Sequence, residues 1–328
     1  MKLLITGGAG YVGSPVVHEL HKLGHEIVIF DNLVYGHRQA APKGVRLVKG
    51  DLIKAKILAN LFEQFEPDAV LHFASYTYVG ESVEKPEKYY RNNVLGALNL
   101  LEAMKDYGIK KIIFSSSAAV YGQPKSVPIK EDAQLSPANP YGETKLMIEE
   151  MLRSFETAYG IRSISLRYFN AAGADMEYDL GEDHTPESHL IPLVMKVALG
   201  KLTEIKVFGD DYDTPDGTCI RDYIHIKDLA KAHILSLDKL AKGSKSDSYN
   251  LGTGTGTSVK EILETARSVS GKKILSKVVS RRAGDPARLV ASFEKAKKEL
   301  GWTPKRSDVK TIVSDAWSWH SKHPEGYR

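Results

Sequence analysis

The sequence contains one cysteine, Cys219, among its 328 residues. A single thiol excludes an intramolecular disulfide and a zinc site built from several cysteines, and it favours a reducing compartment. No apolar run reaches the roughly 18 residues that a membrane-spanning helix requires. The apolar start at Met1–Thr6 is too short for a signal peptide, because glycines follow it at once. We therefore expect a cytoplasmic protein.

A large excess of charge of one sign is also lacking, since the formal net charge is +4. So small an excess does not indicate a nucleic acid as partner. Neither a low-complexity segment nor a repeat of roughly 20–50 residues is apparent. Apolar residues make up 42% of the chain and charged residues 26%, which is typical of a globular protein and excludes a disordered or coiled-coil chain.

Short apolar runs alternate with helical patterns through the first half of the chain. The runs are nearly uniformly apolar, as in a parallel sheet that is buried on both faces. The repeated strand–helix–strand order predicts an α/β fold with a doubly wound parallel sheet. We expect strands at Lys2–Thr6, Glu26–Asp31, Val45–Lys49, Ala69–Phe73, Lys111–Ser116 and Ser163–Arg167, and helices at Tyr11–Leu23, Ile53–Gln64, Glu87–Tyr107 and Gly142–Tyr159.

The pattern changes after about Asn170, where Ala171–Ser188 is rich in Gly, Asp and Pro and predicts a loop. A mixture of short strands and helices follows, which indicates a smaller α+β lobe. The expected strands are Ile205–Phe208 and Tyr249–Leu251, and the expected helices are Leu190–Leu199, Ile226–Leu240 and Val259–Val269. We expect a first domain at residues 1–175 and a second lobe at residues 176–328, with segments near 220–240 free to return to the first domain.

A glycine-rich loop follows the first expected strand. Gly7, Gly10 and Gly13 have the spacing G-x-x-G-x-x-G and open a helix. Residues without a Cβ let a pyrophosphate approach the helix N-terminus, where free N–H groups and the helix dipole favour an anion. A plain tight turn is the alternative, because the spacing differs from G-x-G-x-x-G. The position at the first strand–helix junction favours a dinucleotide site.

Asp31 ends the second expected strand, about 20 residues beyond the glycine loop. A carboxylate there accepts hydrogen bonds from the ribose hydroxyls and repels a 2′-phosphate, which predicts NAD rather than NADP. Asn32 is placed to share the ribose. Asp51 and Leu52 follow the third strand, where they would bracket the adenine.

The strongest catalytic signal is Tyr141–Lys145, whose tyrosine and lysine lie on one face of a helix. The pKa of a free tyrosine is about 10. The Lys145 ammonium and a positive nicotinamide ring are expected to lower it, so that Tyr141 can take a proton from a sugar hydroxyl. Ser117 leaves the C-terminal end of a strand, where ligands bind in open α/β sheets, and is placed to hydrogen-bond that hydroxyl. Alone, Tyr-x-x-x-Lys would be an ordinary helix pair.

In these features the chain resembles the extended short-chain dehydrogenase/reductases. The resemblance runs from Met1 to about Trp319 and implies a Rossmann domain with bound NAD. It also implies the activity of those members that interconvert UDP-glucose and UDP-galactose. In such members Tyr141 would take the proton of the 4-hydroxyl while hydride passes to NAD, with Ser117 assisting and Lys145 holding the cofactor ribose. Further matching stretches are Val79–Ser82, Arg167–Asn170, Asp216–His225, Asn250–Gly252 and Arg281–Pro286.

The resemblance implies two sets of binding residues. The cofactor set is Gly7, Gly10, Tyr11, Val12, Gly13, Asp31, Asn32, Leu33, Asp51, Leu52, Phe73, Ala74, Ser75, Thr77, Asn92, Tyr168 and Phe169. The UDP-sugar set is Asn170, His189, Leu190, Phe208, Arg221, Tyr223, Arg282, Asp285 and Leu289. Arg221 and Arg282 suit a diphosphate, because a guanidinium pairs bidentately with phosphate oxygens. The sequence gives no metal site.

The resemblance also implies a homodimer in which helices Glu87–Tyr107 and Gly142–Tyr159 pair across a two-fold axis. The apolar faces of these helices would serve an internal core equally well.

Three positions depart from the family pattern. Thr77 stands where some members have a lysine near the cofactor, and His189 stands where an asparagine often contacts the substrate. Leu289 stands where members carry a tyrosine or a smaller residue, which leaves the size limit at the sugar open. Action on UDP-N-acetylhexosamine or UDP-uronic acid is therefore the alternative.

Two other activities on this scaffold fit the sequence less well. The nearest is a nucleotide-sugar 4,6-dehydratase or decarboxylase. Dehydratases of the family carry an acidic pair at the positions of Ala118 and Ala119, because elimination needs a proton donor there. A non-catalytic NAD-sensing protein would be expected to lack Tyr141 or Lys145, and both are present.

Overall fold

The structure, a computed structural model, describes residues 1–282 and 285–328. Ala283 and Gly284 of the Arg281–Pro286 stretch lie outside the described residues. None of the described helices combines the length and the hydropathy of a membrane span.

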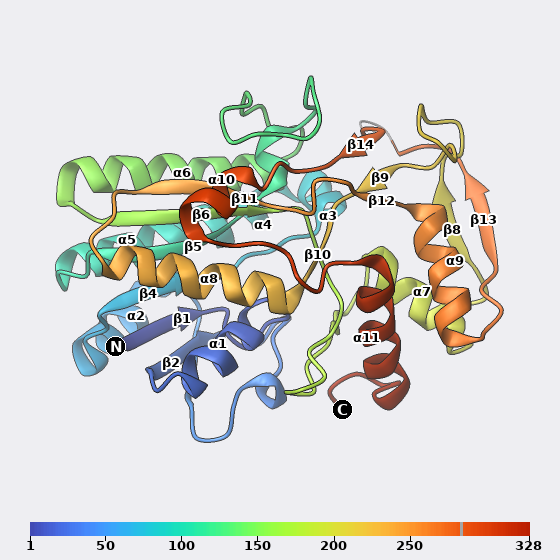
Figure 1. Cartoon of the computed structure of the whole chain (residues 1–328). Helices are drawn as coiled ribbons and strands as arrows, with labels where there is room; N and C mark the ends of the chain where they lie inside the picture. The colour runs from blue at the N-terminus through green and yellow to red at the C-terminus, as the bar shows by residue number, and fades with distance from the viewer. Residues whose placement is uncertain (283–284) are drawn as a thin grey trace.

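A seven-stranded sheet forms the centre of the larger part of the molecule (Figure 1). Its strand order is β11-β6-β5-β4-β1-β2-β3, and every neighbouring pair is parallel. The order reverses between β1 and β4, as in a doubly wound sheet, so the predicted fold class is confirmed. The strands are β1 (Lys2–Thr6), β2 (Glu26–Asp31), β3 (Arg46–Lys49), β4 (Ala69–His72), β5 (Lys111–Ser117), β6 (Arg162–Tyr168) and β11 (Asp247–Leu251).

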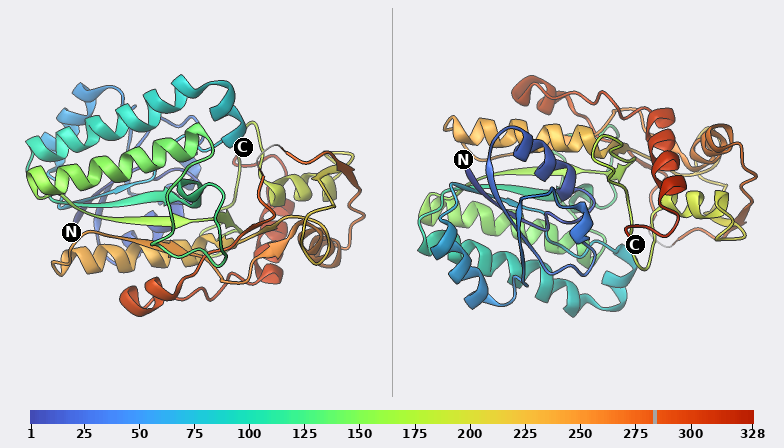
Figure 2. Two further views of the ribbon diagram at one scale, coloured as in Figure 1. Left: turned by 90° about the horizontal axis from the view of Figure 1, so that it is seen from above. Right: turned by 90° about the horizontal axis from the view of Figure 1, so that it is seen from below.

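Helices cover both faces of this sheet (Figure 2). Because successive side chains of a strand point to opposite faces, Leu3 and Ile5 serve one layer and Leu4 serves the other. The first layer holds α1 (Gly13–Lys22) and α8 (Ile226–Ala241), and the second holds α2 (Ala55–Phe65), α5 (Gly96–Asp106) and α6 (Pro140–Tyr159). Burial on both faces explains why these strands form continuous apolar runs in the sequence.

The smaller lobe has its own core. In this core α7 (Leu190–Ala198), α9 (Val259–Ser270) and α11 (Val309–Lys322) pack against β8 (Ile205–Phe208), which pairs with β13 (Ser276–Val279). Two smaller sheets join β7 (Asn170–Ala172) to β10 (Tyr223–His225), and β12 (Thr257–Ser258) to β9 (Ile220–Arg221) and β14 (Arg288–Leu289). The remaining short helices are Arg38–Ala40, α3 (Val79–Glu84), α4 (Pro86–Tyr89), Ala118–Tyr121 and α10 (Glu294–Leu300).

Two elements differ from the sequence-based expectation. The strand expected in the smaller lobe at Tyr249–Leu251 is part of β11, which pairs with β6 in the large sheet. The single helix expected at Glu87–Tyr107 is divided into α4, a π-helical segment at Tyr90–Leu95, and α5. The chain also crosses between the two parts more than once, since α8 lies beside α1. The boundary between residues 175 and 176 therefore stays a prediction.

Candidate active site

The carboxyl ends of the central strands face the smaller lobe (Figure 1). Residues of both parts line a large cleft. Its volume is about 1430 Å³. Every residue that the sequence predicts to touch cofactor or substrate lines this cleft, with the exception of Leu33. The two predicted sets of binding residues, which come from opposite parts of the chain, are thus brought together at one place. The role of each residue stays a prediction.

The glycine loop is packed so tightly that side chains are excluded from it. Gly7 has a φ of +73°, and a Cβ there would lie 2.5 Å from the backbone nitrogen of Ala74. A Cβ at Gly13 would lie 2.4 Å from the carbonyl oxygen of Gly7. The described first turn of α1 contains no acidic side chain, so the positive end of its dipole is left for an external anion. The loop therefore fits a pyrophosphate.

Asp31 is held at the end of β2 by backbone donors. Its carboxylate accepts hydrogen bonds from the N–H groups of Ala9 at 3.0 Å and Leu33 at 2.8 Å. Burial raises the pKa of Asp31 from its ordinary value, and these two hydrogen bonds oppose the rise. Leu33 has a left-handed backbone with a φ of 59°, and its side chain packs against the core cluster that contains Leu3. Leu33 therefore orients Asp31 through its backbone and does not line the cleft.

Tyr141 is placed by the start of α6. Asn139 caps this helix by accepting a hydrogen bond from the Gly142 N–H at 2.9 Å, and Pro140 occupies the first turn. A Cβ at Gly142 would lie 2.5 Å from the carbonyl oxygen of Ala119, so only glycine lets the helix approach the chain that leaves β5. Ser117 ends β5 and accepts a hydrogen bond from the Ala119 N–H at 3.1 Å. The tyrosine and the serine thus meet at one edge of the sheet.

The electrostatics of this group differ from the expectation. Burial raises the pKa of Tyr141 to about 12, while a hydrogen bond from Ser117 lowers it. Burial also lowers the pKa of Lys145 to about 7, against the opposing charge of Glu149. The Lys145 ammonium donates to the carbonyl oxygen of Ser115 at 2.8 Å, and its nitrogen lies 5.8 Å from the centre of the Tyr141 ring. The acidification expected from Lys145 is therefore not supplied by the protein alone.

The π-helical segment fixes one predicted cofactor residue. Asn93 donates to Thr144 Oγ1 on α6 at 3.1 Å and accepts from the Tyr76 N–H at 2.9 Å. Asn92, its neighbour, donates to Asn93 Oδ1 at 2.9 Å and lines the cleft. The wider helical turn thus presents one asparagine to the protein and the next to the cleft, a common use of π-helical turns.

The opposite wall of the cleft carries two guanidinium groups. Arg221 pairs with Asp285 at 2.5 Å, and the Arg282 guanidinium lies 3.9 Å from the centre of the Phe208 ring. Arg221 is anchored further by donating to the carbonyl oxygen of Ile220 at 2.8 Å. In these contacts Asp285 is the one carboxylate that pairs with the two guanidinium groups. The remaining positive charge suits a diphosphate.

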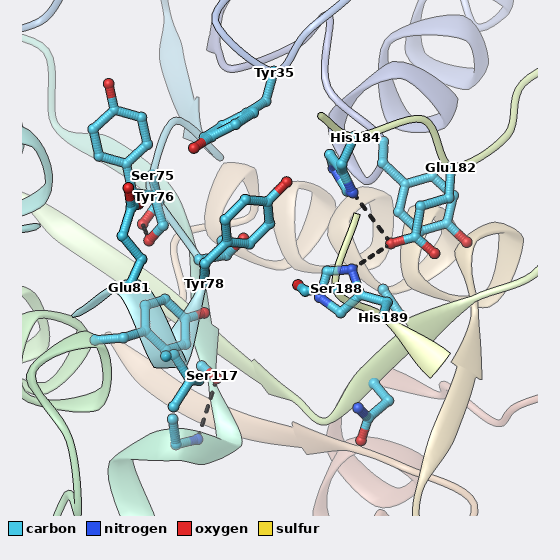
Figure 3. A pocket seen from close by; sticks show the side chains of 18 of the residues that line it. Tyr35, Ser75, Tyr76, Tyr78, Glu81, Ser117, Glu182, His184, Ser188 and His189 are labelled. Atoms are coloured by element: carbon cyan, nitrogen blue, oxygen red, sulfur yellow. Dashed lines mark hydrogen bonds and ion pairs between the residues drawn. The ribbon is translucent and has the colours of Figure 1, made fainter. Parts of the chain in front are cut away.

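Two groups of cleft residues are, apart from His189, not predicted from the sequence. Tyrosines form a wall in which the ring centre of Tyr35 lies 5.6 Å from that of Tyr76 and 5.1 Å from that of Tyr78 (Figure 3). Across from Tyr78 lies a cluster of two carboxylates and two imidazoles on the loop that enters α7. The spacing Glu-x-His-x-x-Glu-x-His at residues 182–189 is the signal that identifies this cluster in the sequence. Scattered tyrosines offer no comparable signal.

Known proteins are similar to this chain in sequence and in architecture. The model of the NAD dependent epimerase/dehydratase family matches residues 3–252. The UDP-glucose 4-epimerase of Halalkalibacterium halodurans is 50% identical over 327 residues, covering 100% of this chain and 98% of the relative. The UDP-glucose 4-epimerase of Brucella ovis, solved in complex with NAD, is 46% identical with a TM-score of 0.94, covering 97% of both chains.

A further solved structure combines both predicted ligands. The UDP-glucose 4-epimerase of Bifidobacterium longum, in complex with NAD+ and UDP, is 40% identical with a TM-score of 0.94, and the match covers 100% of both chains. These likenesses extend over the whole chain and agree with the resemblance that the motifs indicated. The chain therefore belongs to the NAD dependent epimerase/dehydratase family.

Proposed function

We propose that the chain interconverts UDP-glucose and UDP-galactose by inverting C4 of the hexose, with NAD held in the cleft. The observation that carries the proposal is a juxtaposition. Tyr141, Ser117 and Lys145 line the same cleft as the glycine loop on one side and Arg221 and Arg282 on the other. A hexose carbon that lies between these two walls is within reach of both the phenol and a dinucleotide.

The residues present fit NAD. The glycine loop and the start of α1 receive the pyrophosphate, and the buried carboxylate of Asp31 receives the adenosine ribose. A negative charge at Asp31 disfavours a 2′-phosphate, which supports NAD over NADP. Bound NAD supplies a group that accepts a hydride from C4 and later returns it. Lys145 holds the second ribose in this proposal.

Protein side chains supply the acid–base chemistry and the grip on the substrate. Tyr141 removes the proton of the 4-hydroxyl, and Ser117 hydrogen-bonds the same oxygen as the sugar becomes a 4-keto compound. Tyr141 then returns the proton once the keto group has presented its other face. Arg221 and Arg282 hold the diphosphate while the hexose turns. No net oxidation occurs, because the hydride that leaves C4 comes back to it.

The deciding experiment is a substrate panel without added cofactor. The purified chain is incubated with UDP-galactose, UDP-N-acetylgalactosamine or UDP-galacturonate, and the products are identified by NMR. UDP-glucose formed from UDP-galactose supports the proposal. Turnover of the other two sugars alone would favour the alternative, because the half-buried Leu289, which lines the cleft, leaves the size limit at the sugar open. Absence of turnover with all three would overturn both.

The proposal includes a homodimer in the cytoplasm. Leu95 and Met147 are exposed apolar residues next to α5 and on α6, respectively. α5 and α6 contact each other in the second helical layer. Exposed apolar side chains on neighbouring helices support a contact between two copies, because such side chains gain free energy when another chain covers them.

A further inference from the structure

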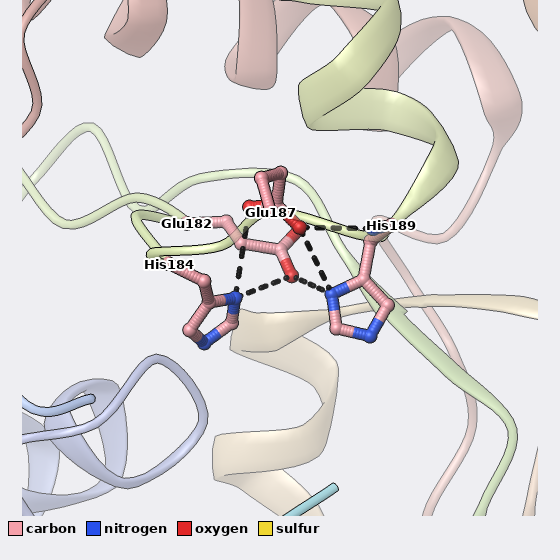
Figure 4. Close-up of side chains that lie close together, drawn as sticks. All are labelled: Glu182, His184, Glu187 and His189. Carbon is pink, nitrogen blue, oxygen red and sulfur yellow. Dashed lines mark hydrogen bonds and ion pairs between the residues drawn. The ribbon is translucent and has the colours of Figure 1, made fainter. Parts of the chain in front are cut away.

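Four side chains from one loop converge at the edge of the cleft: Glu182, His184, Glu187 and His189 (Figure 4). One ligand atom from each residue lies within 4.8 Å of the others. The carboxylates are buried, with only 5% of the Glu182 side chain and 2% of the Glu187 side chain exposed. Two carboxylates that are buried side by side repel each other unless positive charge lies between them.

The four ligand atoms lie close enough together for one ion to contact all four residues. Zn²⁺ binds imidazole nitrogen and carboxylate oxygen at about 2.0–2.1 Å, so neighbouring ligand atoms lie about 3.3 Å apart. His184 Nδ1 lies 3.4 Å from Glu182 Oε1 and 3.6 Å from Glu187 Oε2, and His189 Nδ1 lies 3.4 Å from the other Glu187 oxygen, Oε1. The distance from His189 Nδ1 to Glu182 Oε1 is 2.7 Å, so these two atoms would have to move apart to bind one ion.

The direction of the ring nitrogens is a second, independent observation. Nδ1 of His184 and Nδ1 of His189 are both buried and have no hydrogen-bond partner among the described residues, although carboxylate oxygens lie close enough for one. Both nitrogens instead face the two carboxylates as ion-pair partners, which Figure 4 draws as dashed lines. A buried polar atom without a partner destabilises the fold. Both ring nitrogens lie among the carboxylate oxygens, within reach of an ion that all four residues could share.

We infer that Glu182, His184, Glu187 and His189 bind one divalent transition-metal ion, with Zn²⁺ as the ion that fits best. Two imidazoles exclude Ca²⁺ and Mg²⁺ as preferred ions, because both favour ligand sets made of oxygen alone. The charges also balance, since one divalent cation neutralises the two buried carboxylates. The ion would contact both ring nitrogens and both carboxylates at once.

The location of the site indicates a positioning role. Its loop packs against the tyrosine wall, because the Tyr78 hydroxyl donates to the carbonyl oxygen of Pro186 at 2.7 Å. The His184 ring lies edge-on to the ring of Tyr11, which belongs to the glycine loop, at 6.3 Å. An ion that rigidifies residues 182–189 would therefore hold the start of α7 against the cofactor side of the cleft.

Coordination would also fix the tautomer of His189. With Nδ1 bound to the ion, the ring proton resides on Nε2. The His189 side chain is 40% exposed and lines the cleft, so this N–H is available to a ligand there. This consequence rests on the proposed function, because the ligand in question is its UDP-sugar. The metal site itself does not depend on that function.

The test uses the full chain without a histidine tag. The protein is stripped with a chelator, dialysed and titrated with Co²⁺ alone. We expect one Co²⁺ per chain, with the visible absorption of a four-coordinate ion, and we expect Zn²⁺ to abolish this absorption by displacement. The melting temperature should rise with Zn²⁺. Fewer than one ion per chain, or the spectrum of a six-coordinate ion, would overturn the inference.

Variants separate this site from adventitious binding. His184→Gln and Glu187→Gln should each weaken Co²⁺ binding by at least about 100-fold. The matched control is His21→Gln, which changes an exposed histidine on α1 and should bind Co²⁺ like the wild type. Equal affinity in His184→Gln and wild type would also overturn the inference. Should a variant fail to fold, the wild-type titration decides. No arm uses a UDP-sugar, so failure here is distinct from failure of the proposed function.

Discussion

At the scale of single residues, Tyr141 is the group on which the chemistry depends. Burial raises the pKa of its phenol to about 12 in the protein alone, and the Ser117 hydrogen bond acts in the opposite direction. We expect Tyr141→Phe to lower UDP-galactose turnover by about 10²–10⁴-fold, because the proton acceptor is lost while the ring is kept. Circular dichroism and NAD content should match the wild type. Undiminished turnover in this variant would contradict the assignment of Tyr141 as the base.

The lowered pKa of Lys145 predicts how the free energy of unfolding depends on pH. Its pKa falls from 10.5 in the unfolded chain to about 7 in the fold because of burial. Between these values the unfolded chain binds more protons, so this residue makes the free energy of unfolding rise with pH. The contribution of Lys145 to the free energy of unfolding is present above a pH of about 10.5 and is lost as the pH falls towards 7. The stability of the wild type relative to Lys145→Met should therefore rise from pH 7 to 10, measured by urea unfolding. A constant difference would contradict the lowered pKa.

At the scale of elements, a buried ion pair ties β6 to α6. The Arg167 guanidinium contacts the Glu149 carboxylate at 2.9 and 2.5 Å, and each side chain is only 5% exposed. Arg167→Met should destabilise the fold by about 3–5 kcal/mol, because it leaves a buried carboxylate unpaired. The double variant Arg167→Met, Glu149→Leu should recover most of that loss in urea unfolding. Equal losses in the single and double variants would show that the pairing is not what stabilises this contact.

The outer face of α6 makes a prediction about assembly. Met147 is 40% exposed there, and Leu95 is 37% exposed beside α5. If two copies pair through these helices, Met147→Glu should yield monomers, because a charge would be buried in an apolar contact. Light scattering at micromolar concentration measures this. The matched control Val278→Glu changes an exposed apolar residue on β13 and should stay dimeric. A monomeric wild type would remove the proposed dimer.

At the scale of the whole molecule, the large sheet can be predicted because short stretches of neighbouring residues specify its strands. Strands buried on both faces are apolar throughout, and the glycine loop is a short motif. The smaller lobe was less predictable, since β13 is largely exposed and β14 has two residues that depend on a partner distant in the sequence. Likewise the placement of β11 depends on which edge of a sheet is free. The raised pKa of Tyr141 depends on its burial, and no sequence motif specifies that burial.

The cleft lies between the large sheet and the smaller lobe. This division predicts that binding of NAD and binding of UDP can be lost separately. Asp31 and the glycine loop lie on the sheet side of the cleft, whereas Arg221 and Arg282 lie on the opposite wall. A ligand at 100 times its Kd stabilises a protein by about 2.7 kcal/mol, so UDP should raise the melting temperature of the NAD-containing protein. Arg221→Met, Arg282→Met should abolish this rise yet keep the NAD content of the wild type.

The converse variant completes the argument. Asp31→Ala removes the acceptor for the adenosine ribose and leaves both guanidinium groups in place. It should lower the NAD content, measured after denaturation, while the rise in melting temperature with UDP persists. If either variant lost both ligands together, the cleft would be one cooperative site. The assignment of separate walls to cofactor and substrate would then be wrong.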